Sequence, residues 1–169
     1  MTNPETSRAP LWARLVATFG GTGYLKPGPG SWGSAATVLM WWLVAHVLLS
    51  SEPARSYQPY ICAGLALVAV AVGIPAATLV ARASGKKDPQ FVVIDETAGQ
   101  LITLIGASVA WKSLLAAFIL FRAFDIVKPP PIRLLERFPE GTGIVVDDVG
   151  AGLYALAVMQ LLLHFGVMI

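Results

Sequence analysis

The acidic residues that could do chemistry in this chain fall in three short clusters. Five of the ten acids belong to these clusters, which are Asp95 with Glu96, Asp125, and Asp147 with Asp148. Each cluster adjoins an apolar stretch, where carboxylates are costly unless they are paired or bind a cation. Oxygen ligands that converge from several helices suit a hard divalent cation such as Mg²⁺, which keeps water and substrate phosphate in its shell. The clusters therefore predict a Mg²⁺ site with all five residues as ligands.

Each acidic cluster also has an explanation without a metal. Asp95 or Asp147 could cap a helix, because the helix dipole favours acidic residues at the N-terminus. Asp125 could form an ion pair with Arg122 or Lys128, each three residues away on the same helix face. The topology inferred below puts all three clusters on the same side of the membrane, and this coincidence favours a shared metal site.

A glycine-rich segment at residues 20–33 is a second candidate for phosphate chemistry. Six of its fourteen residues are glycine, and it leads into an apolar stretch with Ser31 and Ser34 as possible helix caps. Glycine lets backbone amides approach an anion closely, and a helix N-terminus attracts negative charge. The segment is not a P-loop, because Lys26 is followed by proline. A simple loop that enters the membrane is the alternative.

Two basic residues flank the three prolines at 129–131, which must end a helix. Lys128 and Arg133 could clamp a phosphate or anchor the chain at lipid head groups. Lys128 lies three residues from Asp125, so we predict phosphate binding for Lys128 and anchoring for Arg133. The predicted phosphate-binding residues are Gly30, Ser31, Ser34, Arg122 and Lys128.

The elements that must position these residues are apolar. Of the 169 residues, 56% are hydrophobic and 13% are charged, against about 25% charged in soluble domains. The mean hydropathy is +0.68. Charge-free stretches at 27–51, 56–81 and 149–169 are long enough for the roughly 20 residues that cross a bilayer. Shorter ones at 97–111 and 113–121 predict two short helices, which form either tilted spans or a re-entrant hairpin.

The predicted fold is all-α, because a backbone in lipid must satisfy its own hydrogen bonds. We predict a single integral-membrane domain over residues 1–169, a polytopic bundle with four to five membrane helices. Residues 1–20 are predicted to form an amphipathic helix in the membrane interface, since Leu11, Trp12 and Leu15 recur at helical spacing.

Lys and Arg are distributed unequally between the two predicted sides of the membrane. Ten lie on one side, and only Arg55 and Lys112 lie on the other. The positive-inside rule then places the N-terminus, the long loops and all three acidic clusters in the cytoplasm. The net charge of +2 is too small to suggest a nucleic-acid partner.

A metal ion held by carboxylates next to a phosphate-binding segment suggests a phosphatase. The phosphatase chemistries that use a histidine or cysteine nucleophile fit this sequence poorly. His46 and His164 lie in apolar stretches without acidic neighbours, and Cys62 lacks the arginine six residues later that a cysteine phosphatase needs. Two readings without phosphatase activity remain open. The carboxylates could form a proton or cation pathway in a small transporter, or ion pairs that only fix helix packing in a structural subunit.

Four ordered motifs resemble the bacterial phosphatidylglycerophosphatase A family. They are PGPGSWGS at 27–34, DETAG at 95–99, FRAFDIVKPPPI at 121–132 and GTGIVVDDVGAG at 141–152. The match runs from about Gly20 to Gly152, and Ser31 stands where the family usually has threonine.

The resemblance implies a bacterial enzyme of the cytoplasmic membrane that needs Mg²⁺. It would remove the terminal phosphate of the lipid phosphatidylglycerophosphate and give phosphatidylglycerol. In this hypothesis the metal ligands also include the general base. The predicted catalytic residues are Asp95, Glu96, Asp125 and Asp148, with Asp147 as a further metal ligand.

Overall fold

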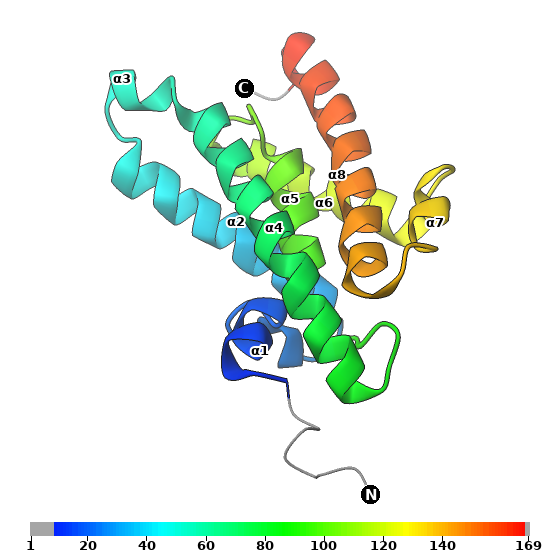
Figure 1. Cartoon of the computed structure of the whole chain (residues 1–169). Helices are drawn as coiled ribbons and strands as arrows, with labels where there is room; N and C mark the ends of the chain where they lie inside the picture. The colour runs from blue at the N-terminus through cyan, green and yellow to red at the C-terminus, as the bar shows by residue number, and fades with distance from the viewer. Residues whose placement is uncertain (1–8, 168–169) are drawn as a thin grey trace, which may run out of the picture.

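The computed structural model describes residues 9–167. All the regular secondary structure of these residues is helical, and they contain no strand (Figure 1). The elements of these residues are α1 (Leu11–Ala17), a 3₁₀ turn η2 (Thr22–Tyr24), α2 (Pro29–Leu48), α3 (Glu52–Arg55), α4 (Gln58–Ser84), α5 (Ile94–Thr103), α6 (Trp111–Val127), α7 (Ile132–Leu135) and α8 (Glu140–His164). The all-α prediction is confirmed.

Three of these helices are long and apolar enough to cross a membrane. They are α2 with 20 residues, α4 with 27 and α8 with 25. At 1.5 Å per residue even α2 spans roughly 30 Å, the thickness of a hydrocarbon core. Their outward side chains include exposed aliphatic groups such as Val47 and Leu67, each 71% exposed. Lipid is the natural environment for such a surface.

The two helices predicted to be short are short. With 10 residues, α5 is roughly 15 Å long, and with 17 residues α6 is roughly 25 Å long. The boundaries of α5 differ from the predicted stretch at 97–111, because the helix begins at Ile94 and ends at Thr103. A turn follows in which Gly106 has a φ of 74°, a conformation that glycine adopts at least cost.

The last helix begins nine residues earlier than the charge-free stretch at 149–169 suggests. It starts at Glu140, so Asp147 and Asp148 lie about two turns inside α8. The capping explanation for Asp147 is therefore wrong. The prediction failed because it placed the start of the helix after the last charge. Both acids are buried within the protein and do not face the surrounding lipid.

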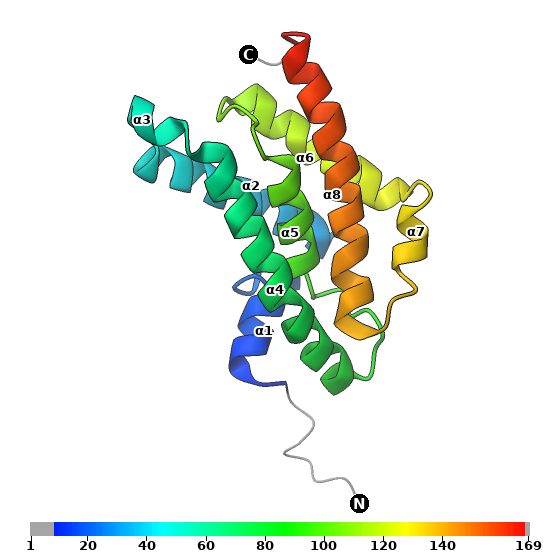
Figure 2. The ribbon, with the colours of Figure 1, turned by 45° about the horizontal axis from the view of Figure 1, so that its top comes forward.

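Helix α5 forms the centre of the bundle. It packs against α8, α4, α2 and α6, and Figures 1 and 2 show it enclosed among them. Nine of its ten residues are buried. Small residues permit this close packing, as in other membrane bundles: a β-carbon added to Gly152 of α8 would lie 2.5 Å from the carbonyl oxygen of Gly99.

The predicted N-terminal amphipathic helix is found only in part. Helix α1 covers residues 11–17, and residues 1–8 of the predicted segment lie outside the described part of the chain. Ala13 and Ala17 are buried, and α1 packs on α4, while Leu11, Trp12 and Leu15 remain exposed. That this apolar side rests in the membrane interface stays a prediction.

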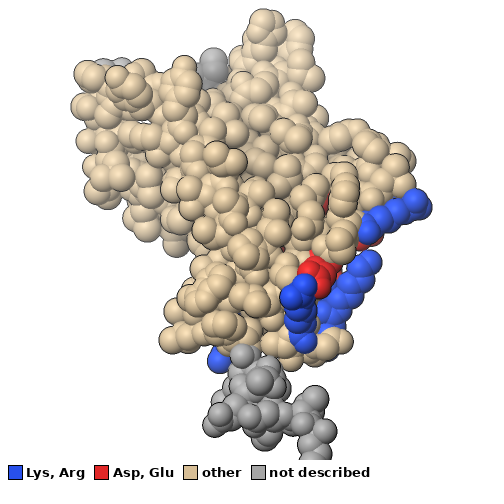
Figure 3. Space-filling model, viewed as in Figure 1, with Lys and Arg blue, Asp and Glu red and all other residues tan. Residues whose placement is uncertain are grey.

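Charged side chains gather at one end of the molecule. On the face shown in Figure 3 they lie toward the end where α4 finishes and α8 begins, and the upper part of that face has none. The end with the charges is the one at which the candidate site opens.

Candidate active site

A cavity of about 410 Å³ lies at the charged end of the bundle. Its walls come from the start of α2, the loop before α5, the first turn of α5, the end of α6 and the second turn of α8. The lining residues are Gly28, Pro29, Gly30, Asp88, Gln90, Val92, Asp95, Glu96, Arg122, Asp125, Lys128, Ile144, Asp147 and Asp148. The fold thus brings all five predicted acids into one cavity with three of the five predicted phosphate-binding residues.

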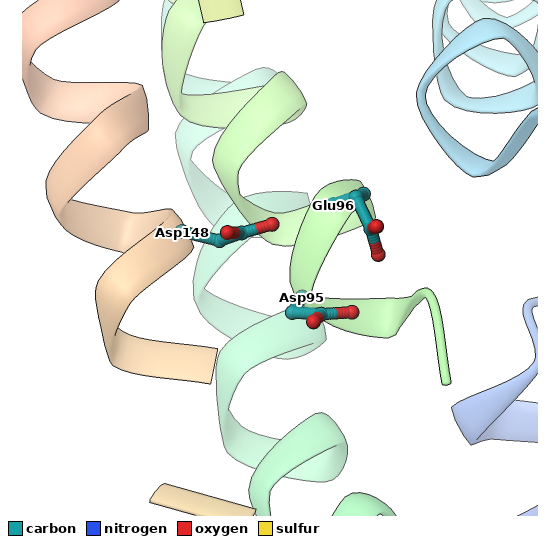
Figure 4. Close-up of side chains that lie close together, drawn as sticks. All are labelled: Asp95, Glu96 and Asp148. Atoms are coloured by element: carbon teal, nitrogen blue, oxygen red, sulfur yellow. The ribbon is translucent and has the colours of Figure 1, made fainter. Parts of the chain in front are cut away.

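Three of the acids form a tight group. Figure 4 shows Asp148 extending from α8 toward the first turn of α5, which carries Asp95 and Glu96. One carboxylate oxygen from each residue lies within 4.8 Å of the others. Asp95 Oδ1, Glu96 Oε2 and Asp148 Oδ2 are buried without a hydrogen-bond partner among the described residues. Three carboxylates held this way repel one another, and a bound cation would relieve that repulsion.

The group fits a hard divalent cation such as Mg²⁺. All its donors are carboxylate oxygens, the ligands that Mg²⁺ prefers, and one oxygen of each residue lies within 4.8 Å of the others, near enough to converge on one ion. The whole cavity has six carboxylates and two basic groups, a formal charge of −4. An anionic phosphate would be repelled from such a cavity unless cations neutralised part of its charge.

Asp125 lies beside this group and pairs with a base. Arg122 Nη1 is 2.6 Å from Asp125 Oδ2 and 3.7 Å from Glu96 Oε1. The ion pair that was the alternative explanation for Asp125 is therefore present. The pair is part of the cavity, and Arg122 joins Asp125 of α6 to Glu96 of α5.

Asp147 is also held by a base. Lys128 Nζ donates to Asp147 Oδ2 at 2.5 Å and to Glu136 Oε1 at 2.8 Å. Partial burial disfavours the ammonium, but these two hydrogen bonds outweigh it and raise the pKa of Lys128 above its usual value. Lys128 is therefore a permanent positive charge at the cavity wall.

Arg133 does not line the cavity. Its Nε donates to the carbonyl of Lys128 at 3.0 Å, and its Nη2 donates to the carbonyl of Val127 at 3.2 Å. Carbonyls at a helix C-terminus lack intrahelical donors, so Arg133 satisfies the end of α6 and fixes the backbone of Lys128.

The glycine-rich segment reaches the cavity through its backbone. Helix α2 begins at Pro29 with Gly28 as its N-cap, so the prediction that Ser31 or Ser34 caps it is wrong. Both serines lie inside the first turns and outside the cavity lining, and the Ser34 hydroxyl donates to the Gly30 carbonyl at 2.9 Å. A β-carbon on Gly30 would overlap Glu96 Oε1 and lie 3.0 Å from Arg122 Nη1.

Sequence reasoning missed three polar residues near the site. Asp88 and Gln90 line the cavity, and Glu136 of the α7 region pairs with Lys128. All three are in charged or proline-containing loops that read as solvated surface. Asp88 and Gln90 lie between the glycine-rich motif and DETAG, and Glu136 lies between the last two motifs. Only these places in the chain hinted at a role.

Known proteins resemble this chain over most of its length. The family model for phosphatidylglycerophosphatase A matches residues 15–163. A Haemophilus influenzae protein named phosphatidylglycerophosphatase A is 35% identical over 147 residues, covering 86% of this chain and 85% of its own. Its Escherichia coli namesake is 30% identical over 155 residues, covering 90% and 84%.

The name of a third relative mentions a different substrate. A Bacteroides thetaiotaomicron protein described as a candidate phosphatidylinositol-3-phosphatase is 35% identical over 144 residues, covering 83% of this chain and 87% of its own. No solved structure matches the chain. The family model covers most of the chain, including all four motifs from which the resemblance was predicted. The chain therefore belongs to the phosphatidylglycerophosphatase A family.

Proposed function

We propose that this chain hydrolyses the terminal phosphate monoester of phosphatidylglycerophosphate to phosphatidylglycerol, with Mg²⁺ as cofactor. Membership in the family makes it a phosphatase, that is, a phosphoric monoester hydrolase. The observation that carries the proposal is the convergence of Asp95, Glu96 and Asp148 in the cavity. The transport alternative gains no support, because the acids of the three motifs gather in one cavity at one end of the bundle.

The metal would be held by Asp95, Glu96 and Asp148, whose buried oxygens have no other partner among the described groups. When bound, Mg²⁺ would neutralise phosphate oxygens and lower the pKa of a coordinated water. A carboxylate of the cavity would accept the proton of the attacking water. Asp125 and Asp147 would hold the two basic groups in place.

The phosphate would lie between Arg122, Lys128 and the start of α2. Pro29 has no amide hydrogen and the Ser31 amide already donates to the Gly28 carbonyl at 3.0 Å, so the first turn offers the Gly30 amide. Lys128 would exchange one carboxylate partner for a phosphate oxygen. Phosphoryl transfer is accelerated mainly by such positioning and charge stabilisation.

We further propose that the cavity faces the cytoplasm from a bacterial cytoplasmic membrane. The support is the distribution of Lys and Arg, ten on the side of the cavity and two on the other. A site at the cytoplasmic end of the bundle would let the acyl chains of the substrate stay in the bilayer while its phosphate reaches the carboxylates.

Removing the metal should abolish activity reversibly. Purified protein in detergent, given phosphatidylglycerophosphate, is expected to release inorganic phosphate with Mg²⁺, to stop with EDTA and to recover when Mg²⁺ is added back. Phosphatidylinositol 3-phosphate and phosphatidic acid serve as competing substrates. Turnover that persists in EDTA would refute the requirement for a metal. Preference for another lipid phosphate would refute phosphatidylglycerophosphate as the substrate.

Gly30→Ala should impair catalysis without unfolding the protein. The new methyl group would displace Glu96 and Arg122, whose flexible ends can move at little cost to the free energy of unfolding. We expect kcat to fall about 10- to 100-fold, as when groups that orient metal ligands are disturbed. The control is Gly64→Ala on α4, whose β-carbon meets nothing within 4 Å. Equal kcat in both variants would show that Gly30 is not part of the site.

A further inference from the structure

Two buried side chains of the bundle, one on α2 and one on α5, have polar atoms that no described group satisfies. Gln100 of α5 is 0% exposed, and neither its Nε2 nor its Oε1 has a hydrogen-bond partner among the described residues. Trp41 of α2 is also 0% exposed, and its Nε1 is equally without one. A buried polar group left in this state costs about 1–3 kcal/mol. Three such atoms in one region call for a partner.

The packing of α2 on α5, continued by one further turn, would put these two residues in the same layer. A β-carbon on Gly33 would lie 2.8 Å from Val93 Cβ, and one turn further along both helices Thr37 Oγ1 lies 3.2 Å from Thr97 Oγ1. This step advances by four residues on each helix. A second step of the same size would bring Trp41 opposite residue 101, the neighbour of Gln100 in the chain.

The hydroxyl hydrogens of the layer below are used elsewhere. Thr37 Oγ1 already donates to the Gly33 carbonyl at 2.8 Å, and Thr97 Oγ1 donates to the Val93 carbonyl at 3.2 Å. Glu96 lies four residues before Gln100, on the same face of α5, and its Oε2 is buried and unpartnered too. Orphaned polar atoms therefore continue from the cavity inward, past the threonine pair.

We propose that Trp41 and Gln100 bind buried water at the α2–α5 interface, and that this water positions the Glu96 carboxylate. Buried waters are held by two to four polar partners, and the two residues offer an indole N–H, an amide donor and an amide acceptor. Water held there would donate to Glu96 Oε2. Gln100 is then a positioning residue, acting on a carboxylate that it does not touch. The role assigned to Glu96 rests on the proposed function, but the water site does not.

X-ray radiolytic labelling in ¹⁸O-enriched water tests the water site on the folded protein without substrate. Hydroxyl radicals formed from bound water modify nearby side chains even when these are buried. Trp41 is expected to acquire ¹⁸O, and this labelling is expected to fall several-fold in Gln100→Met. Met159, also 0% exposed but with an intrinsically more reactive side chain, is the internal reference and should be labelled less than Trp41. Absence of label on Trp41, or equal label in the variant, would overturn the proposal.

Steady-state kinetics tests the positioning role. We expect kcat of Gln100→Met to fall about 10-fold, the scale for groups that orient metal ligands, while KM changes less than about two-fold. Gln160→Met is the matched control, because Gln160 does not line the cavity. Its Nε2 donates directly to the Ile105 carbonyl, at a distance of 2.7 Å. An unchanged kcat in Gln100→Met rejects the positioning role. If the wild type releases no phosphate at all, the proposed function fails, and the labelling still decides the water site.

Discussion

Replacing Asp148 by asparagine is expected to reduce phosphate release by at least about 100-fold. Loss of a group that merely orients a metal ligand costs 10- to 100-fold, so loss of a direct ligand should cost at least as much. Asp148 is 3% exposed, and one of its carboxylate oxygens belongs to the group of oxygens within 4.8 Å of one another. An amide keeps the shape of the side chain but removes the charge that a cation needs. Initial rates across a Mg²⁺ titration measure the effect.

The Mg²⁺ titration separates a lost ligand from a damaged fold. Asp148→Asn should need more Mg²⁺ for half-maximal activity, while its unfolding temperature in EDTA stays at or above that of the wild type, since one of three repelling charges is gone. Glu140→Gln is the matched control on the same helix, because Glu140 forms only an exposed ion pair with Arg82. If Asp148→Asn and this control behave alike, Asp148 is not a ligand.

Gly152→Ala is expected to destabilise the bundle strongly. Its β-carbon would lie 2.5 Å from the Gly99 carbonyl oxygen and 2.9 Å from Gly99 Cα, closer than real β-carbons approach other atoms. Because both obstacles are backbone atoms, α5 and α8 must move apart. Overpacking of this kind costs about 1–3 kcal/mol or more. The movement would also draw Asp148 away from Asp95 and Glu96, so activity should fall together with stability.

Thermal unfolding in detergent and phosphate release together measure this prediction. The control is again Gly64→Ala, a glycine within α4 that has open space around it. There alanine should raise stability by up to about 1 kcal/mol, because it favours the helix. A Gly152→Ala variant as stable and active as the wild type would mean that the two helices are not in the contact described.

The candidate site was predictable from sequence where charge is rare. In an apolar chain, an acid pair such as Asp147 and Asp148 is conspicuous, and the order of the spans indicates which acids share an end. How the acids divide between roles was not predictable. Spacing gives no sign that Asp147 pairs with Lys128 while Asp148 joins Asp95, because that depends on how α8 is rotated against α5.

The helix boundaries were predicted less well, for a physical reason. Charge-free stretches mark where lipid is tolerated, but helices continue through charged residues wherever protein or a cavity surrounds them. Helix α8 therefore starts at Glu140, well before its apolar part. The three orphaned atoms of Trp41 and Gln100 were equally hidden, since a lone glutamine or tryptophan in an apolar stretch carries no signal until the neighbouring helices are in place.

The burial of α5 on all sides has a consequence for biogenesis. A ten-residue helix with two acids in its first turn is a poor substrate for lateral release from a translocon into lipid. Its resting place is formed by helices on both sides of it in the chain, and α8 is synthesised last. We therefore expect α5 to take its place in the bundle only after α8 has been synthesised. Completion of the phosphate site and completion of the membrane domain would then be a single event.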